Sequence, residues 1–291
     1  MTAATDHILR TRVERSGRIA ELFAARRQPA GLTGDTGRLM LMAADHPARG
    51  ALRAGADALA MADRGRLLDR LALALSRPGV DGVLGTPDVL EDLLLMGALE
   101  GKVAIGSMNR GGLAGTAFEI DDRFTAYDAE AVQRVGLQGG KMLLRIDPED
   151  PATAGTLEAC AKAVGDLATR GLMAMVEPFI AHRVDGRVRN DLTTEAVIRS
   201  AGVASGLGWT SAHTWLKLPV IDDMEPVLAA TTLPVLLLGG EVATDQEAQF
   251  ESWRKVLGNP QVRGMVVGRT LLSPPDGDVA GAVDAVVEML R

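Results

Sequence analysis

The chain has 291 residues, of which 47% are hydrophobic and 24% charged, a balance typical of a globular protein with ample material for a large core. Its formal net charge is −7, so no overall basic field exists to bind nucleic acid or an anionic membrane surface. Local arginines, backbone N–H groups and helix ends could still bind a small anionic substrate.

The first 30 residues lack the continuous apolar core of a signal peptide, and no later apolar run reaches membrane-spanning length without charge. The single cysteine, Cys160, lies within an apparent helix, so no disulfide can form within the chain. We therefore expect a soluble, cytoplasmic protein that binds neither nucleic acid nor membranes.

From residue 38 onward, short runs rich in Val, Leu, Ile and Met alternate with longer segments of helical period, and the pattern repeats about eight times. Most runs are almost continuously apolar, as expected for parallel strands that are covered on both faces. The expected strands are residues 38–45, 80–86, 102–108, 141–147, 172–178, 213–220, 234–240 and 264–270.

The segments between these strands have the pattern of amphipathic helices, and several begin at Asp, Thr or Pro and end at Gly. A strand–helix unit repeated eight times in about 250 residues predicts an α/β fold, a (β/α)8 TIM barrel over residues 37–291. A doubly wound open sheet is the alternative, but no G-x-G-x-x-G turn follows the first strand. The expected helices are residues 57–76, 87–101, 128–136, 153–171, 193–208, 223–232, 245–258 and 278–290.

Residues 1–36 precede the first expected strand and carry a helical pattern. We expect them to form an N-terminal helical extension, which either covers the floor of the barrel or takes part in a subunit contact.

Polar residues gather in and after the expected strands, most of them toward the C-terminal ends, where (β/α)8 barrels carry their catalytic groups. The first strand runs into Asp45 and His46, the third into Asn109 and Arg110, the fourth contains Lys141, Arg145 and Asp147, the fifth ends at Glu177, and the sixth holds Lys217.

Structural roles are the alternative for several of these residues. Asp45 could cap a turn, and Glu177 could mark the end of its strand. Lys141 could reach water from the strand entrance, and Arg145 could pair with Asp147.

Lys217 is harder to explain structurally, because it lies in the middle of an apolar strand. Burial lowers the pKa of a lysine, and so does a neighbouring cation such as Lys141. A neutral amine can form a protonated Schiff base with a substrate carbonyl, and this group withdraws electrons while the adjacent carbon–carbon bond breaks or forms. Glu177 and Asp45 are the candidate proton carriers for this chemistry.

The last two expected strands end in glycines, at Gly239, Gly240 and Gly268, and Arg269 follows the last of them. Glycines allow backbone N–H groups to approach an anion closely, and the loops after strands seven and eight of such barrels commonly bind phosphate. The alternative is that these glycines merely turn the chain.

Together these residues resemble the class I (Schiff-base) aldolases of (β/α)8 fold, in particular the branch with fructose-bisphosphate and tagatose-bisphosphate aldolases. The resemblance implies catalytic roles for Asp45, Lys141, Glu177 and Lys217, with Lys217 as the Schiff-base lysine, no cofactor and a homo-oligomer. In some relatives the fifth strand carries a tyrosine as the acid/base; the only tyrosine here is Tyr127, outside that strand, so Glu177 must take the role.

The whole chain resembles more closely an actinobacterial deoxyribose-phosphate aldolase-like family linked to inositol catabolism. That resemblance implies cleavage of 6-phospho-5-dehydro-2-deoxy-gluconate to dihydroxyacetone phosphate and malonic semialdehyde. The carboxylate of such a substrate could pair with Arg145, Arg110 or Arg49. His46 could tune Asp45 or contact the substrate.

Other functions stay open at this point. The same family resemblance is compatible with a fructose-bisphosphate, tagatose-bisphosphate or deoxyribose-phosphate substrate. A metal-dependent aldolase or isomerase would need ligands such as His46, Asp147, Glu177, His182 and His213, but their spacing is not that of a metal motif, and no metal is expected. A barrel that only binds sugar phosphates is the non-catalytic alternative.

Overall fold

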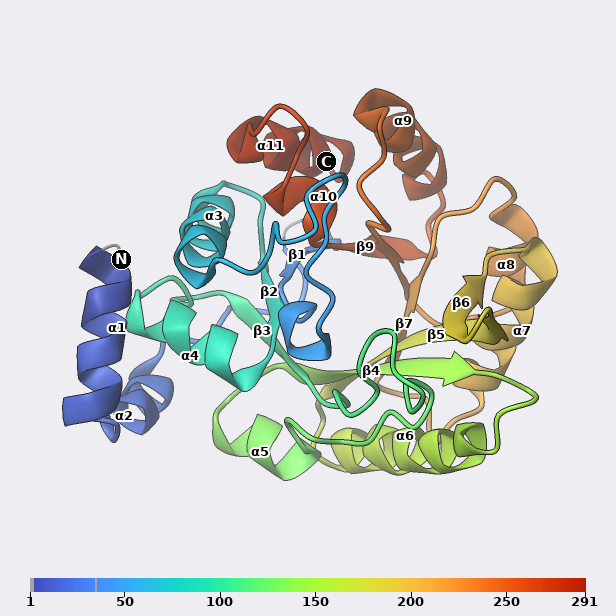
Figure 1. The fold of residues 1–291 in the computed structure, drawn as a ribbon, viewed down its shortest axis with the longest axis horizontal. Coiled ribbons are helices and arrows are strands. Elements are labelled where there is room, and N and C mark those ends of the chain that lie inside the picture. Colours follow the sequence, from blue (N-terminus) through green and yellow to red (C-terminus); the bar gives the residue numbers. More distant parts are fainter. Residues whose placement is uncertain (1–2, 35) are drawn as a thin grey trace.

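Eight parallel strands close into a barrel surrounded by helices in the computed structural model, which describes residues 3–34 and 36–291 (Figure 1). Neighbouring strands follow the order β4-β3-β2-β1-β9-β8-β7-β5, and pairing of β4 with β5 completes the ring. The predicted (β/α)8 barrel is therefore confirmed. The strands are β1 Leu39–Ala43, β2 Gly82–Gly85, β3 Val103–Ser107, β4 Gly139–Ile146, β5 Met173–Val184, β7 Thr214–Leu218, β8 Val235–Leu238 and β9 Val262–Val267.

The strands are buried on both sides, which explains their continuous apolar runs. In β1, for example, Leu39 and Leu41 join an apolar cluster inside the barrel, whereas Met40 and Met42 join the larger cluster between the barrel and the helices.

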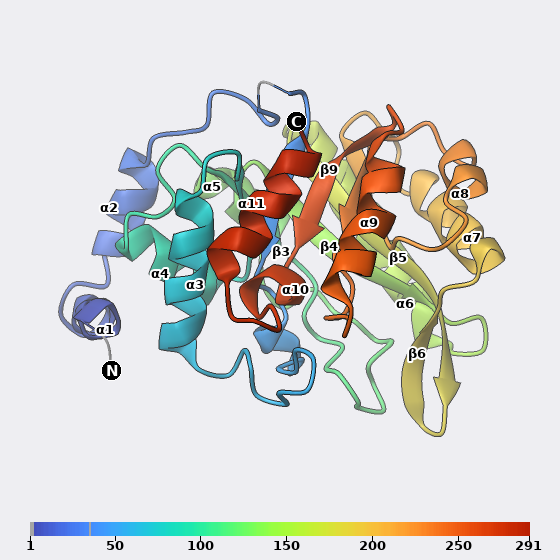
Figure 2. The ribbon, with the colours of Figure 1, turned by 90° about the horizontal axis from the view of Figure 1, so that it is seen from above.

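Helices form the outer ring around the strands (Figure 1), and the view from above shows α3, α11 and α9 side by side along one side of the barrel (Figure 2). Aspartate or threonine side chains accept a hydrogen bond from the first turn of α3, α5, α7, α9 and α11 and so fix where these helices begin. The helices are α1 Ala3–Glu14, α2 Arg18–Ala25, α3 Arg64–Ser76, α4 Pro87–Leu95, α5 Ala129–Arg134, α6 Ala152–Thr169, α7 Thr194–Ser205, α8 Glu225–Ala229, α9 Gln246–Leu257, α10 Arg269–Leu272 and α11 Val279–Met289, with a 3-10 turn at Pro47–Arg49. No helix within the described ranges is long and apolar enough to cross a bilayer.

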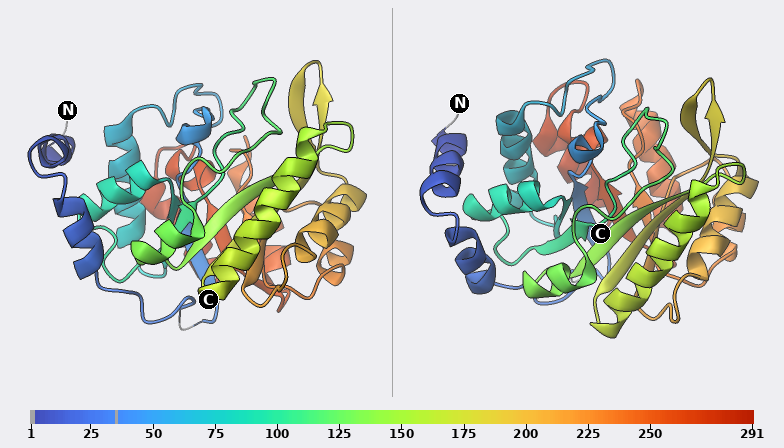
Figure 3. Two further views of the ribbon diagram at one scale, coloured as in Figure 1. Left: turned by 90° about the horizontal axis from the view of Figure 1, so that it is seen from below. Right: turned by 60° about the horizontal axis from the view of Figure 1, so that its bottom comes forward.

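Several segments differ from the sequence-based expectation, among them residues 96–101, which form turns after α4 instead of continuing the helix. Residues 57–63 form a loop rather than the start of a helix, because Asp63 caps α3 at its own position. More importantly, β5 runs on to Val184 and pairs with an antiparallel strand, β6 Arg187–Asp191, that was not predicted. The hairpin turns at Asp185 and Gly186, both with positive φ. It projects from the same end of the barrel as the loops after β1 and β3 (Figures 2 and 3).

The N-terminal helices lie on the outside of the barrel beside α4 (Figure 1). Arg12 of α1 pairs with Glu91 and Asp92, at 2.8 and 2.9 Å. After α2, Arg26 donates to the carbonyl groups of Lys102 and Gly136, just before β3 and β4. Further along this linker, Leu32 packs against the apolar cluster inside the barrel. The linker, rather than the two helices, therefore lies at the barrel floor; the division of the chain at residue 36 stays a prediction.

Candidate active site

A cavity of about 630 Å³ opens at the C-terminal ends of the barrel strands. The side chains and backbone of all ten residues predicted for the site line it: Asp45, His46, Lys141, Arg145, Glu177, Lys217, Gly239, Gly240, Gly268 and Arg269. A second cavity, of about 410 Å³, lies outside the barrel beside α6 and has mainly apolar walls. The charged groups that could do chemistry converge in the barrel cavity, so we place the site there.

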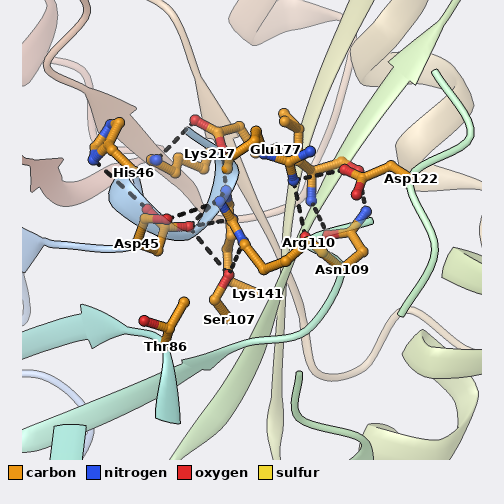
Figure 4. A network of polar contacts seen from close by, with 12 residues as sticks. Asp45, His46, Thr86, Ser107, Asn109, Arg110, Asp122, Lys141, Glu177 and Lys217 are labelled. Carbon is orange, nitrogen blue, oxygen red and sulfur yellow. Dashed lines mark hydrogen bonds and ion pairs between the residues drawn. The ribbon is translucent and has the colours of Figure 1, made fainter. Parts of the chain in front are cut away.

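The centre of the cavity is a chain of alternating charges (Figure 4). The ammonium of Lys217 lies 2.7 Å from Oε1 of Glu177, and the other oxygen of Glu177 pairs with Lys141. Lys141 also approaches Oδ2 of Asp45, at 3.3 Å. These four side chains come from β4, β5, β7 and the end of β1, so closure of the barrel brings them together.

Asp45 is held from its other side by Arg110 and Ser107. Arg110 donates to the side chain of Asp45, to its carbonyl oxygen at 3.0 Å, and to Ser107 Oγ at 2.7 Å. Ser107 in turn donates to Asp45 at 3.1 Å. Asp45 is only 2% exposed, and a carboxylate at such a depth is stable only with partners of this kind.

The charges of the central residues shift their pKa values. Burial raises the pKa of Glu177, but Lys141 and Lys217 outweigh burial and hold it well below the usual range. Asp45 behaves in the same way, with Arg110 and Lys141 as the main cations. Burial lowers the pKa of Lys141 to about 8, although Asp45 and Glu177 oppose the shift. Both carboxylates are therefore ionised at neutral pH and able to accept protons.

The structure corrects the expected surroundings of Lys217. Trp215 shares the interior face of β7 with it and Leu216 and Leu218 face the helices, as the strand pattern predicts. However, the ammonium lies against Glu177 rather than in apolar surroundings. The apolar sequence of β7 could not predict this contact, because the carboxylate comes from a neighbouring strand.

The purely structural roles considered for Lys141 and Arg145 differ from the contacts that these residues make. Lys141 is 2% exposed and points into the site instead of reaching water. Arg145 pairs with Glu119, at 3.0 Å, and not with Asp147. Tyr127 is buried in the cluster between barrel and helices, so its hydroxyl does not line the cavity.

Steric constraints alone require glycine at the turns after β8 and β9. A Cβ atom on Gly268 would lie 2.5 Å from the carbonyl oxygen of Ala43 and 2.8 Å from Cε1 of His46. A Cβ atom on Gly239 would overlap Val267, and Gly240 has a φ of +68°. Both turns nevertheless border the cavity, where an anion could approach them.

Arg269 follows Gly268 and is weakly neutralised. The nearest carboxylate, Glu241, lies 3.7 Å away with its side chain 86% exposed. The guanidinium of Arg269 can therefore turn to a ligand anion without breaking a buried ion pair.

His46 lies beside this cation and is neutral. Burial, with smaller effects from Arg269 and Lys217, lowers its pKa to about 3 in spite of Asp45. Its Nδ1 atom is 3.8 Å from Asp45 and finds no hydrogen-bond partner among the described residues. A neutral imidazole in this position can donate or accept one hydrogen bond to a ligand.

The cavity is strongly cationic even though the chain is acidic. Among the described residues, seven cationic side chains and three carboxylates line it. Such a cavity suits an anionic ligand.

The sequence did not single out Ser107, Arg189 or Asn190, because a serine ending an apolar strand and two polar residues in an unpredicted hairpin carry no distinctive pattern.

The side chains considered as metal ligands come together at most in pairs, such as His182 and Asp147 at 4.0 Å. Within the described part of the chain, no three His, Cys, Asp or Glu side chains are grouped as a metal site requires. The geometry offers amines and carboxylates for acid–base and nucleophilic chemistry instead.

Comparison with known proteins gives a consistent fold. A family model described as Cgl0159-like matches residues 37–287. The crystal structure of Cgl0159 from Corynebacterium glutamicum is 50% identical, with a TM-score of 0.97 over 100% of this chain and 97% of that chain. A search of curated proteins found no match.

Two aldolase structures share the barrel at lower identity. A Schiff base forming fructose-1,6-bisphosphate aldolase aligns with a TM-score of 0.67 and 20% identity, over 94% of this chain and 100% of that chain. An archaeal fructose 1,6-bisphosphate aldolase aligns with a TM-score of 0.66 and 20% identity, over 94% of this chain and 98% of that chain. At this level of identity the likeness establishes the fold.

Proposed function

This chain belongs to the Cgl0159-like family, and we propose that it is a class I aldolase in which Lys217 forms a Schiff base with a phosphorylated ketone. The substrate class is a phosphorylated keto sugar or sugar acid. Within that class we propose 6-phospho-5-dehydro-2-deoxy-gluconate, which would yield dihydroxyacetone phosphate and malonic semialdehyde. The barrel fold shared with a Schiff base forming fructose-1,6-bisphosphate aldolase supports the reaction type.

One observation carries the proposal: a buried lysine amine and a carboxylate lie 2.7 Å apart at the C-terminal mouth of the barrel. A nucleophile within hydrogen-bond distance of a base is the arrangement that covalent catalysis needs. The carboxylate is ionised, because Lys141 and Lys217 hold the pKa of Glu177 low. It can therefore take the proton that Lys217 must lose.

Schiff-base formation follows from this pair. Lys217 transfers a proton to Glu177, and its amine adds to the substrate carbonyl to give a carbinolamine. Glu177 then returns a proton to the carbinolamine hydroxyl, which leaves as water, and a protonated imine remains. Lys141 lies between the two carboxylates and lines the cavity, so its ammonium can bind the oxygens of the substrate during these steps.

Carbon–carbon cleavage uses the imine as the electron acceptor. A carboxylate, Asp45 or Glu177, removes the proton of the hydroxyl on the far carbon, and that oxygen forms the aldehyde carbonyl as the bond breaks. The bonding electrons move to the imine nitrogen and leave an enamine on Lys217. Protonation of the enamine carbon and hydrolysis of the resulting imine release the ketone and restore Lys217.

The phosphate end of the substrate fits the turns after β8 and β9. Gly239, Gly240 and Gly268 give access to the backbone, and Arg269 supplies a positive charge. His46 lies next to Arg269 and can add a hydrogen bond. We assign the opposite end of the substrate to Arg145.

Borohydride reduction in the presence of dihydroxyacetone phosphate, followed by peptide mass mapping, tests the proposal. Borohydride reduces a protonated imine to a stable secondary amine, so the expected result is a single adduct on Lys217. Borohydride without the ketone is the control. An adduct on Lys141, or no adduct, would overturn the proposal.

A further inference from the structure

Three arginines lie near the strand ends of the cavity, and their partners differ sharply. Arg110 uses its Nε and both terminal nitrogens on Asp45 and Ser107. Arg49 pairs with Asp122 at 2.6 Å and donates to the carbonyl oxygens of Gly112 and Asn109. The protein itself therefore occupies every nitrogen of the Arg110 guanidinium and both terminal nitrogens of Arg49, and only Nε of Arg49 lacks a hydrogen-bond partner among the described residues.

Arg145 is different, because its buried donors are not satisfied. Its Nη1 atom lies 3.0 Å from Glu119 without forming a hydrogen bond, and neither Nη1 nor Nε has a hydrogen-bond acceptor among the described residues. Glu119 is itself engaged by the backbone N–H of Gly115, at 2.7 Å. Buried donors without an acceptor are costly, so an acceptor supplied by a ligand is the simplest account of this geometry.

The wall around Arg145 extends onto the hairpin that the sequence did not predict. Arg145 pairs in register with Phe179 of β5, which lines the cavity. Farther along β5, Ala181 lies opposite Asn190 of β6. Directly opposed residues of antiparallel strands share a face, so Asn190 lies on the face of Phe179. Asn190 also lines the cavity, and its side-chain amide forms no hydrogen bond with another described residue.

We propose that Arg145 and Asn190 form a binding site for a carboxylate at the end of the substrate opposite the phosphate. This inference rests on the proposed function and deepens it by naming the second anionic group. A carboxylate suits the fork of a guanidinium, and the asparagine amide can donate one more hydrogen bond. No glycine of β4, β5 or β6 lines the cavity, unlike at the end proposed for phosphate, and Glu119 offsets part of the positive charge. Both features favour a singly charged carboxylate over a second phosphate.

Equilibrium binding of two phosphorylated ligands tests the site. 6-Phosphogluconate and glucitol 6-phosphate have the same chain and phosphate and differ in carrying a carboxylate or a CH2OH group at the other end. Titration calorimetry should show the acid binding about 10- to 100-fold more tightly to the unchanged protein, the range expected for hydrogen bonds to a charged group. Equal affinities, or no binding of the acid, would overturn the proposal.

Substitutions of the two proposed ligand-binding residues test whether they cause the preference for the acid. Asn190→Asp should weaken binding of the acid about tenfold, because it places a negative charge beside the carboxylate, and should change glucitol 6-phosphate binding less than about twofold. Arg145→Lys, which keeps the charge and loses the fork, should also reduce the preference. Arg187→Ala is the matched control: it makes the same change in charge on the same hairpin, at a residue that does not line the cavity. An equal effect of Arg187→Ala would overturn the assignment.

A bisphosphate ligand separates the two possible anions. If glucitol 1,6-bisphosphate binds more tightly than the acid and Asn190→Asp removes that advantage, the second anion is a phosphate and the carboxylate assignment is wrong. None of these ligands has a ketone or aldehyde group, so no imine forms and the outcome does not depend on Schiff-base formation at Lys217. Failure of borohydride trapping would overturn the proposed function alone.

Discussion

Glu177 binds Lys217 through one carboxylate oxygen, at 2.7 Å, and Lys141 through the other. One carboxylate therefore serves two amines, and both amines are almost completely buried. A proton that leaves Lys217 has an acceptor in direct contact, and Lys141 still compensates the charge of Glu177 when Lys217 becomes neutral. This arrangement suits a lysine that must lose its proton, form a bond and regain the proton in every cycle.

The two lysines should respond differently to substitution. Lys217→Met removes the proposed nucleophile, so turnover should fall at least about 10⁴-fold and the borohydride adduct should disappear. Lys141→Met should lower turnover but still allow an adduct on Lys217. Each variant leaves Glu177 with one cation, so thermal unfolding followed by circular dichroism provides a matched check of folding. Persistence of the adduct in Lys217→Met would contradict the assignment.

Glu177→Gln should damage both activity and stability. Loss of the base should reduce turnover about 10²- to 10⁴-fold, the usual contribution of a positioned proton carrier. It also leaves two buried ammonium groups without their shared carboxylate, and breaking a buried ion pair costs about 3–5 kcal/mol of unfolding free energy. Denaturant unfolding measures the second effect. Adding Lys141→Met should recover part of the lost stability, and no recovery would argue against the shared-carboxylate account.

The sequence predicts the barrel well because strands covered on both sides leave continuous apolar runs, and the helices between them leave a helical period. Counting these units places Lys217 on the sixth barrel strand and Asp45 at the end of the first. The rule that polar strand ends converge then brings the ten candidate residues to one cavity, as the structure shows.

The partners of these residues could not be predicted in the same way. Whether Arg145 pairs with Asp147 or Glu119 depends on the path of the loop after β3, which has no periodic pattern. The sequence pattern did not predict β6, because its residues are largely exposed and polar. An Asp-Gly pair such as Asp185–Gly186 is nevertheless typical of a β-hairpin turn. The sequence pattern therefore located the charged groups but not their pairing.

Stability should depend on pH through Lys141. Burial lowers its pKa from 10.5 to about 8, so between these values the unfolded chain binds more protons than the folded one. The unfolding free energy contributed by this residue therefore rises with pH across that interval and is constant below it. Urea unfolding at pH 7.5 and pH 10 should show the native protein gaining stability relative to Lys141→Met. A difference between the two proteins that does not change with pH would contradict the lowered pKa.

Arg269 should distinguish phosphorylated from unphosphorylated ketones. Among the described residues, the exposed Glu241 is the only carboxylate that pairs with its guanidinium, at 3.7 Å, so Arg269 can bind a phosphate at little cost. Arg269→Ala should raise the dihydroxyacetone phosphate concentration needed for half-maximal borohydride trapping about tenfold, the effect of losing one hydrogen-bonded charge. The concentration needed for dihydroxyacetone, which has no phosphate, should change little. Arg263→Ala is the matched control, because Arg263 is an exposed residue of β9, the strand that precedes Arg269, and does not line the cavity. Equal losses for the two ketones would show that Arg269 supports the shape of the site rather than binding phosphate.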